Sequence, residues 1–152
     1  MITFSRTVTV TAEFPDEDTV RMRGTLADHI YAMDLDVDIR IADGVITAID
    51  GAMKRVTTPF CGDAVPVLQT AVGMCVREKG WISKVNRDIG RQGCEHFAAI
   101  LVECGRCLDT ARLSRDTAVR LALDPTVPAE SAAAAWIEQH PEAWTLAEVA
   151  EG

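Results

Sequence analysis

The first third of the chain alternates apolar and polar residues with a period of two, which is typical of strands with one buried face. The longest alternating run covers residues 29–41, and two shorter runs at 7–14 and 20–26 precede it. A fourth run at 45–53 follows an Ala-Asp-Gly sequence, which is a common hairpin turn. The pattern therefore predicts an antiparallel sheet of about four strands over residues 3–54.

The run at 29–41 divides its side chains strictly between two faces. The predicted core face carries His29, Tyr31, Met33, Leu35, Val37, Ile39 and Ile41. Asp34, Asp36 and Asp38 fall on the other face, where a row of charges is a solvated surface that discourages edge-to-edge pairing. A metal-binding role for these carboxylates is the less favoured alternative. The alternation thus places His29 on the core side, at one end of the strand.

Beyond the sheet the apolar period changes from two to that of a helix. Residues 63–79 have helical spacing, with Asp63 as a candidate N-cap and Gly80 as a stop signal. A short amphipathic helix follows, and residues 94–113 form a long helix with one apolar face. Two or three helices on one antiparallel sheet define an α+β fold. We expect residues 1–124 to form this single domain.

Residues 125–152 are set off by Pro125 and Pro128, and we expect them to form a C-terminal helical extension. Its sequence predicts an alanine-rich helix followed by a short acidic one. Its large apolar side chains would dock on the core or on a partner subunit, which makes a homodimer one expected assembly; they are Trp136, Ile137 and Trp144. His140, before Pro141, is expected to be exposed at a helix end and not to be a ligand.

Composition and charge exclude several classes of function. The 152 residues carry a net charge of −8 with no basic stripe, which argues against a nucleic-acid partner. No apolar run reaches the roughly 20 residues of a membrane span, and the alternating N-terminus is unlike a signal peptide. We therefore expect a cytoplasmic protein without a membrane partner. In that reducing compartment its five cysteines should be thiols, metal ligands or nucleophiles.

The five cysteines differ in their predicted surroundings. Cys75 and Cys104 lie in the apolar stripes of the two predicted helices and are expected to pack in the core. Cys107 could complete a Cys-x-x-Cys metal clip with Cys104, but without a second such pair core packing is favoured. Cys61 and Cys94 instead stand near the first residues of a predicted helix, where unpaired N–H groups favour the reactive thiolate.

These positions indicate one composite site. His96 follows Cys94 by two residues, in the turn that opens the helix, so both side chains can reach the space above the helix end. With Cys61, and with His29 on the core side of the sheet, the set supplies two thiols and two imidazoles. These are ligand types of a tetrahedral zinc or iron centre. The four residues are far apart in sequence, so only the fold could bring them together.

The same residues carry a resemblance to a protein family. The strand that begins with His29, the turn containing Cys61 and the Gly-Cys-Glu-His-Phe run at 93–97 resemble a bacterial domain family of unknown function, over residues 20–112. The signatures of that family read His-Asp-Met on the strand and Gly-Cys-Thr-His-Leu before the last long helix. The resemblance implies that His29, Cys61, Cys94 and His96 belong to one site.

The chain departs from these signatures at four positions, which are Ile30, Tyr31, Glu95 and Phe97 in place of Asp, Met, Thr and Leu. The carboxylate partner of His29 that the first signature implies is then absent or is supplied by Asp28.

A more distant similarity is topological. A small antiparallel sheet, a Cys in the turn that leaves it and a long helix opening with Cys and His are similar to the U-type scaffolds that assemble iron-sulfur clusters. This resemblance implies a cluster on Cys61 and Cys94, with His96 nearby.

Two classes of function use these residues differently. An enzyme would act on a small polar molecule with a metal-bound water or the Cys94 thiolate, and His29 or His96 would be the general base. A scaffold or carrier would hold a metal or cluster and exchange it with a donor or acceptor protein; a structural metal site with a binding role is a third option. The enzyme is favoured, because His29 on the core side indicates an enclosed pocket.

Overall fold

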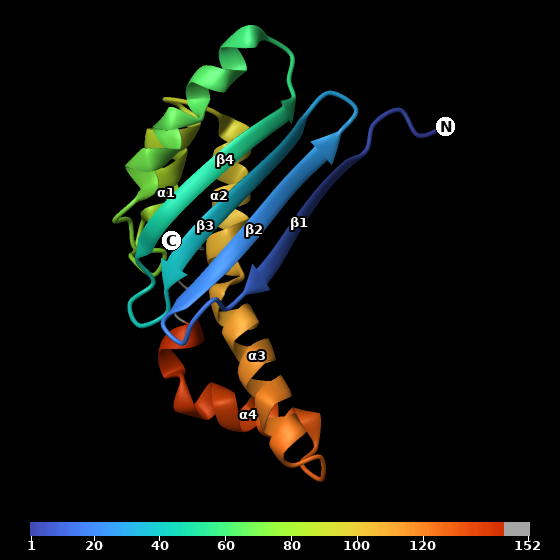
Figure 1. Ribbon diagram of the computed structural model, residues 1–152, viewed down its shortest axis with the longest axis vertical. Coiled ribbons are helices and arrows are strands. Elements are labelled where there is room, and N and C mark those ends of the chain that lie inside the picture. The colour runs from blue at the N-terminus through green and yellow to red at the C-terminus, as the bar shows by residue number, and fades with distance from the viewer. Residues whose placement is uncertain (145–152) are drawn as a thin grey trace.

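The computed structural model describes residues 1–144 and contains a four-stranded antiparallel sheet (Figure 1). The strands lie side by side in chain order and are β1 (Arg6–Glu13), β2 (Thr19–Asp28), β3 (Ala32–Arg40) and β4 (Ile46–Arg55). In β2 and β3 every second side chain is buried. The antiparallel sheet that the two-residue period predicted is therefore confirmed.

The third strand begins three residues later than predicted. The Asp28 carboxylate accepts hydrogen bonds from the backbone N–H groups of Ile30 at 2.7 Å and Tyr31 at 2.6 Å, and these bonds bend the chain into a turn. His29 lies in this turn and is exposed, so its predicted place on the core face is wrong. The rest of the alternation is confirmed by the buried side chains Met33, Leu35, Val37 and Ile39.

Helices cover one face of the sheet and leave the other face open (Figure 1). The helix α2 (Glu95–Arg106) packs against β2 and β3. Gly24 in β2 permits this close approach, because a Cβ at that position would clash with the Ile100 side chain. Gly51 in β4 has a similar role, since its Cβ would lie 2.5 Å from the Leu68 side chain and 3.1 Å from the Phe97 ring. The two layers confirm the predicted α+β fold.

The helix predicted over residues 63–79 is wrong. The elements between β4 and α2 are the 3-10 helices η1 (Pro59–Ala64) and η2 (Pro66–Ala71), the helix α1 (Trp81–Val85) and the π-helical turn η3 (Asn86–Gly90). Pro66 lacks the N–H that a continuing helix requires. Gly73 has a φ of +88°, a left-handed conformation that turns the chain out of helical structure.

Three cysteines lie away from the start of α2. Cys104 is fully buried as predicted, and burial raises the pKa of its thiol to about 12. Cys107, one residue beyond α2, is partly buried and packs against the core, in agreement with the core interpretation. Cys75 lies on a loop in an isolated bridge with Val45, and its Sγ is 3.1 Å from the Asp43 carbonyl oxygen. Its predicted place in a helical core stripe is therefore wrong.

The long helix predicted over residues 94–113 is two helices. Whereas α2 ends at Arg106, α3 (Leu108–Leu123) continues beyond the sheet, and α4 (Ala129–Gln139) folds back along it (Figure 1). The 3-10 helix η4 (Pro141–Trp144) follows. The C-terminal helical extension is thus confirmed up to residue 144. None of the helices within residues 1–144 has the length and apolar character needed to cross a membrane.

The extension docks on α3 mainly through Trp136. This side chain is 6% exposed, and its indole N–H donates to the Asp116 carboxylate at 2.9 Å. Ile137 remains 38% exposed. His140 is half-buried, because its ring stacks on Trp136 with 4.1 Å between centroids, so its predicted exposure is wrong. The Trp144 side chain and the acidic helix predicted near the C-terminus lie outside the described residues.

A buried ion cluster joins α3 to the loop before α1. Oδ1 of Asp109 accepts hydrogen bonds from Arg77 at 2.9 Å and from Arg112 at 2.7 Å. All three side chains are at most 12% exposed. Burying charges is costly unless they are paired, so Asp109 stabilises two guanidinium groups at once.

Candidate functional site

A pocket of about 320 Å³ lies between the start of β3, the end of β4, η1 and the first turn of α2. Three of the four predicted site residues line it: Cys61 from η1, and Cys94 and His96 from the start of α2. Another wall is formed by Tyr31, which precedes β3, and by the buried Met33 of β3. The fold therefore brings two thiols and one imidazole to a single cavity.

Cys94 is the N-cap of α2. Its backbone is extended, with φ −140° and ψ 121°, and its side chain makes no capping hydrogen bond, so the thiol is available to the pocket. Two hydrogen bonds fix the turn between η3 and Cys94. The N–H groups of Gly93 and Cys94 both donate to the Ile89 carbonyl, at 2.9 and 3.0 Å. Gly93 allows this packing, since a Cβ there would lie 3.1 Å from the Val67 side chain.

His96 is the second residue of α2 and belongs to its first turn. Its Nδ1 is 3.9 Å from Cys94 Sγ, and its ring packs on Tyr31 with 4.4 Å between centroids. Burial lowers the pKa of His96, and the charge of the nearby Arg6 lowers it further. The imidazole is therefore neutral at pH 7 and can accept a proton.

Cys61 stands near the start of the first 3-10 helix. Its Sγ is 3.4 Å from the Thr58 hydroxyl, and this hydrogen bond lowers the pKa of the Cys61 thiol. The thiol is half-buried, and the adjacent Phe60 is 77% exposed at the mouth of the pocket. The Thr58 hydroxyl therefore favours the thiolate of Cys61, the second thiol of the pocket.

His29, the fourth predicted site residue, does not line this pocket. Its ring instead meets Phe4 edge-on, with 5.4 Å between centroids. Asp28, the expected carboxylate partner of His29, is buried and pairs with Arg6 at 2.7 Å. The backbone N–H of Tyr31 and the Arg6 guanidinium lower the pKa of this carboxyl to about 2. Asp28 thus holds the turn and the N-terminal strand, and its carboxylate is engaged by Arg6 and by the backbone of the turn.

The metal centre expected from the sequence is not preformed. Within residues 1–144, no group of three or more His, Cys, Asp or Glu side chains is arranged to hold a metal ion. Cys61, Cys94 and His96 share the pocket without converging on one point. The displacement of His29 into the turn removes one of the four expected ligands.

Several residues that line the pocket were missed by the sequence analysis. They are Met33, Met53, Phe60, Asp63 and Glu95, together with Tyr31, which was placed on the core face without a role in the site. Asp63 and Glu95 stand within two residues of the pocket cysteines. This closeness in sequence could have identified them as pocket residues. The two methionines carried no such signal, because alternation predicts only that they face the core.

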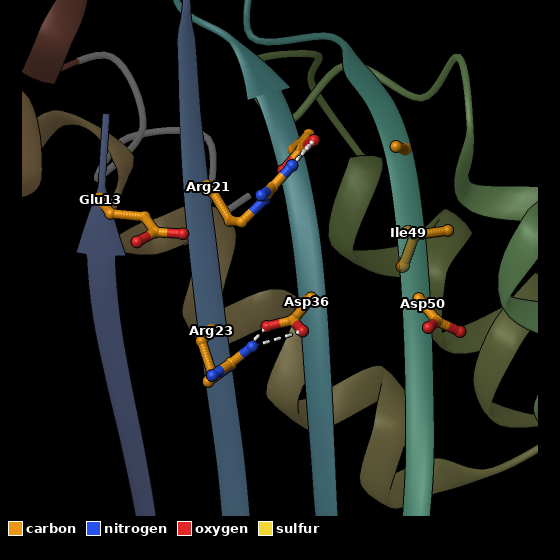
Figure 2. A pocket seen from close by; sticks show the side chains of 8 residues that line it. Glu13, Arg21, Arg23, Asp36, Ile49 and Asp50 are labelled. Carbon is orange, nitrogen blue, oxygen red and sulfur yellow. Dashed lines mark hydrogen bonds and ion pairs between the residues drawn. The ribbon is translucent and has the colours of Figure 1, made fainter. Parts of the chain in front are cut away.

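The open face of the sheet has a second hollow, of about 280 Å³ (Figure 2). Arg21 pairs with Asp38, and Arg23 pairs with Asp36 through two hydrogen bonds of 2.7 and 2.9 Å. The acidic row of β3 is therefore neutralised largely by arginines on β2, as a solvated sheet face requires. No thiol or imidazole lines this hollow.

The fold and the site together define a class of protein. It is an α+β protein whose pocket is lined by thiols and an imidazole. A family model described as protein of unknown function (DUF2889) matches residues 5–108, and the chain belongs to this family. The matched range includes all four strands and the pocket, whereas nearly all of α3 and the whole of α4 follow it. Neither a curated protein nor a solved structure gives a significant match.

Proposed function

We propose that the protein is an enzyme that acts on a small polar molecule in this pocket, with Cys94 as nucleophile and His96 as general base. The observation that carries the proposal is the 3.9 Å separation of Cys94 Sγ and His96 Nδ1 within the pocket. A thiol becomes an effective nucleophile when a neighbouring base takes its proton. Contacts of this kind are often long without substrate and shorten when it binds.

The chemistry is a displacement at an electrophilic carbon. His96 Nδ1 accepts the Sγ proton of Cys94 as the sulfur attacks that carbon and a C–S bond forms. The bond to the leaving group breaks, and the leaving group takes the electron pair and the proton from Nδ1. Water then attacks the same carbon and gives a proton to His96, the C–S bond breaks with its electron pair going to Sγ, and Sγ takes the proton from Nδ1, which restores the thiol and the neutral imidazole. The lowered pKa of His96 supports this role, because only the neutral ring accepts a proton.

A second candidate is a bound zinc or iron ion. It is favoured by the presence of Cys61, Cys94 and His96 on one pocket, since thiolates and imidazole are preferred ligands of these metals. The side chains would have to move together, and a water or a pocket carboxylate would supply the ligand that His29 does not. The corresponding carrier function would place an iron-sulfur cluster on Cys61 and Cys94, for exchange with a partner protein.

A panel of small esters, thioesters and amides tests the enzyme proposal. Protein mixed with each compound is quenched in acid, and the adduct is located by peptide mass mapping. We expect a transient adduct on Cys94, absent in Cys94→Ser, slowed in His96→Gln and retained in Cys107→Ser. Absence of any adduct, or equal labelling of Cys75 and Cys94, would contradict the proposal.

Elemental analysis of untagged protein separates the two candidates. About one zinc or iron per chain, lost in Cys94→Ser and in His96→Gln but retained in Cys107→Ser, would support the metal site. Metal-free protein that still forms the Cys94 adduct would support the thiol enzyme.

A further inference from the structure

We propose that the pocket selects a cationic substrate, one that carries a protonated amine or a quaternary ammonium group. This inference rests on the proposed function, because it names the substrate class for the same Cys94 site. The charges on the pocket walls carry the argument. Asp63 and Glu95 both line the pocket, and no lysine or arginine lines it. Both carboxylates belong to exposed residues, and neither has an ion-pair partner among residues 1–144.

Two of the positive charges close to the pocket are offset. The N-terminus of α2 carries roughly half a positive charge beside Cys94. Glu95, in the first turn of the same helix, places a carboxylate close to that partial positive charge and opposes it. Arg6 acts on His96 but is paired with Asp28 at 2.7 Å, and the imidazole itself is neutral at pH 7. Arg55, whose guanidinium donates to the Tyr31 carbonyl at 3.2 Å, lies outside the pocket lining, so the charged side chains of the lining itself are the carboxylates of Asp63 and Glu95.

The uncharged walls of the pocket suit an organic cation. Tyr31 and Phe60 place two aromatic rings on the pocket, and aromatic faces attract ammonium groups. Phe60 is 77% exposed, so its ring is open to a ligand at the mouth of the pocket. Met33 and Met53 add polarizable apolar surface. A volume of about 320 Å³ limits the ligand to a small molecule.

The hollow on the open face of the sheet provides an internal comparison. Its walls also carry carboxylates, but Arg21 and Arg23 pair with Asp38 and Asp36 there (Figure 2). The arginines make this hollow a surface of mixed charge, whereas the lining of the Cys94 pocket carries carboxylates and no guanidinium group. Glu13, on the wall of the hollow, is a suitable position for a control substitution.

Two methanethiosulfonate reagents of similar size test the charge preference. One carries a trimethylammonium group and the other a sulfonate, and the rate of Cys94 modification is followed by peptide mass mapping. Each rate is divided by the rate of the same reagent with 2-mercaptoethanol. We expect the normalised ratio of cationic to anionic rates to exceed ten at Cys94 and to fall several-fold in Asp63→Asn and in Glu95→Gln. The control Glu13→Gln should leave it unchanged. A ratio near one, or a preference for the sulfonate, would overturn the inference.

A second measurement does not depend on thiol reactivity. Benzyltrimethylammonium chloride should raise the Tm of the native protein at constant ionic strength, whereas sodium benzenesulfonate should not, and the shift should be lost in Glu95→Gln. If Cys94 reacts with neither reagent but the Tm shift is present, the thiol mechanism is wrong and the cation preference stands. If Cys94 reacts rapidly with both reagents and the Tm does not shift, the cation preference alone is wrong.

Discussion

Cys94 Sγ lies 3.9 Å from His96 Nδ1, although the two residues are only two positions apart. Side chains with this spacing inside a regular helix point away from each other. The pair meets because Cys94 has the extended backbone of an N-cap while His96 belongs to the first helical turn. The contact between the two side chains therefore depends on the helix beginning at Glu95.

The first prediction concerns the protonation of His96. Because burial and Arg6 lower its pKa below 6.5, this imidazole should stay neutral at pH values where an exposed histidine is half protonated. Proton acceptance from Cys94 should accordingly be lost only as pH falls through this lowered value. The unfolded chain binds the proton first, so His96 contributes stability that declines as pH falls from above 6.5 toward the folded pKa. An NMR titration of the imidazole resonances measures this shift.

Arg6→Gln should raise the pKa of His96, because the substitution removes a positive charge and leaves the Asp28 carboxylate unpaired. The matched control is Arg106→Gln, which removes an arginine that pairs with Glu103 on the surface of α2. Equal His96 titrations in both variants would show that Arg6 does not act on the imidazole.

The second prediction ranks the cysteines by their reaction with iodoacetamide in the native protein. Cys61 should react faster than Cys104, because the Thr58 hydroxyl favours its thiolate whereas burial keeps Cys104 protonated and inaccessible. Thr58→Val should slow the reaction of Cys61 several-fold at pH 7. Thr70→Val, which changes an exposed threonine of η2, is the control and should not slow it. Rapid labelling of Cys104 without unfolding would contradict the burial of this residue.

The third prediction concerns the buried ion cluster. Asp109→Ala leaves the Arg77 and Arg112 guanidinium groups buried without their shared carboxylate, which should cost about 3–5 kcal/mol of unfolding free energy. Asp36→Ala, which breaks the exposed pair with Arg23, should cost under about 1 kcal/mol. Urea denaturation of both variants provides the comparison, and similar losses would refute the role assigned to burial.

The fourth prediction tests the contact between sheet and helix. Gly24→Ala should lower the unfolding free energy by about 1–3 kcal/mol, because the added methyl group would clash with Ile100 on α2. Gly62→Ala meets no atom within 4 Å and is the control. If thermal unfolding gives the two variants the same Tm, the core around Gly24 can shift to accommodate a methyl group, and the prediction is wrong.

The sheet could be predicted because alternation reports burial directly. Met33 to Ile39 follow a strict period of two, and each apolar member of that run is buried. The same pattern failed at His29, because the side chain of Asp28 binds the backbone of the next residues and ends the strand. It failed again over residues 63–79, where spacing suggested a helix but Pro66 and Gly73 prevent its hydrogen bonds from continuing.

The candidate site was predictable in part. Cys61 and Cys94 were singled out because each stands near a predicted helix start, and both line the pocket even though the element at Cys61 is a 3-10 helix. Met53 and Tyr31 could not be identified, since only the pairing of β3 with β4 and the packing of α2 bring them to the same cavity. The bound metal and the homodimer stay predictions.

The most direct test of the account is the rate of Cys94 alkylation by iodoacetamide at pH 7, measured in the native protein and in His96→Gln. General bases contribute on the order of 10²-fold or more to catalysed steps, and we expect a loss of at least about tenfold for this simpler reaction. Circular dichroism and Cys61 labelling should be unchanged, which would exclude a general loss of structure. A Cys94 rate that is the same in both proteins would contradict the assignment of His96 as the base and, with it, the proposed enzyme.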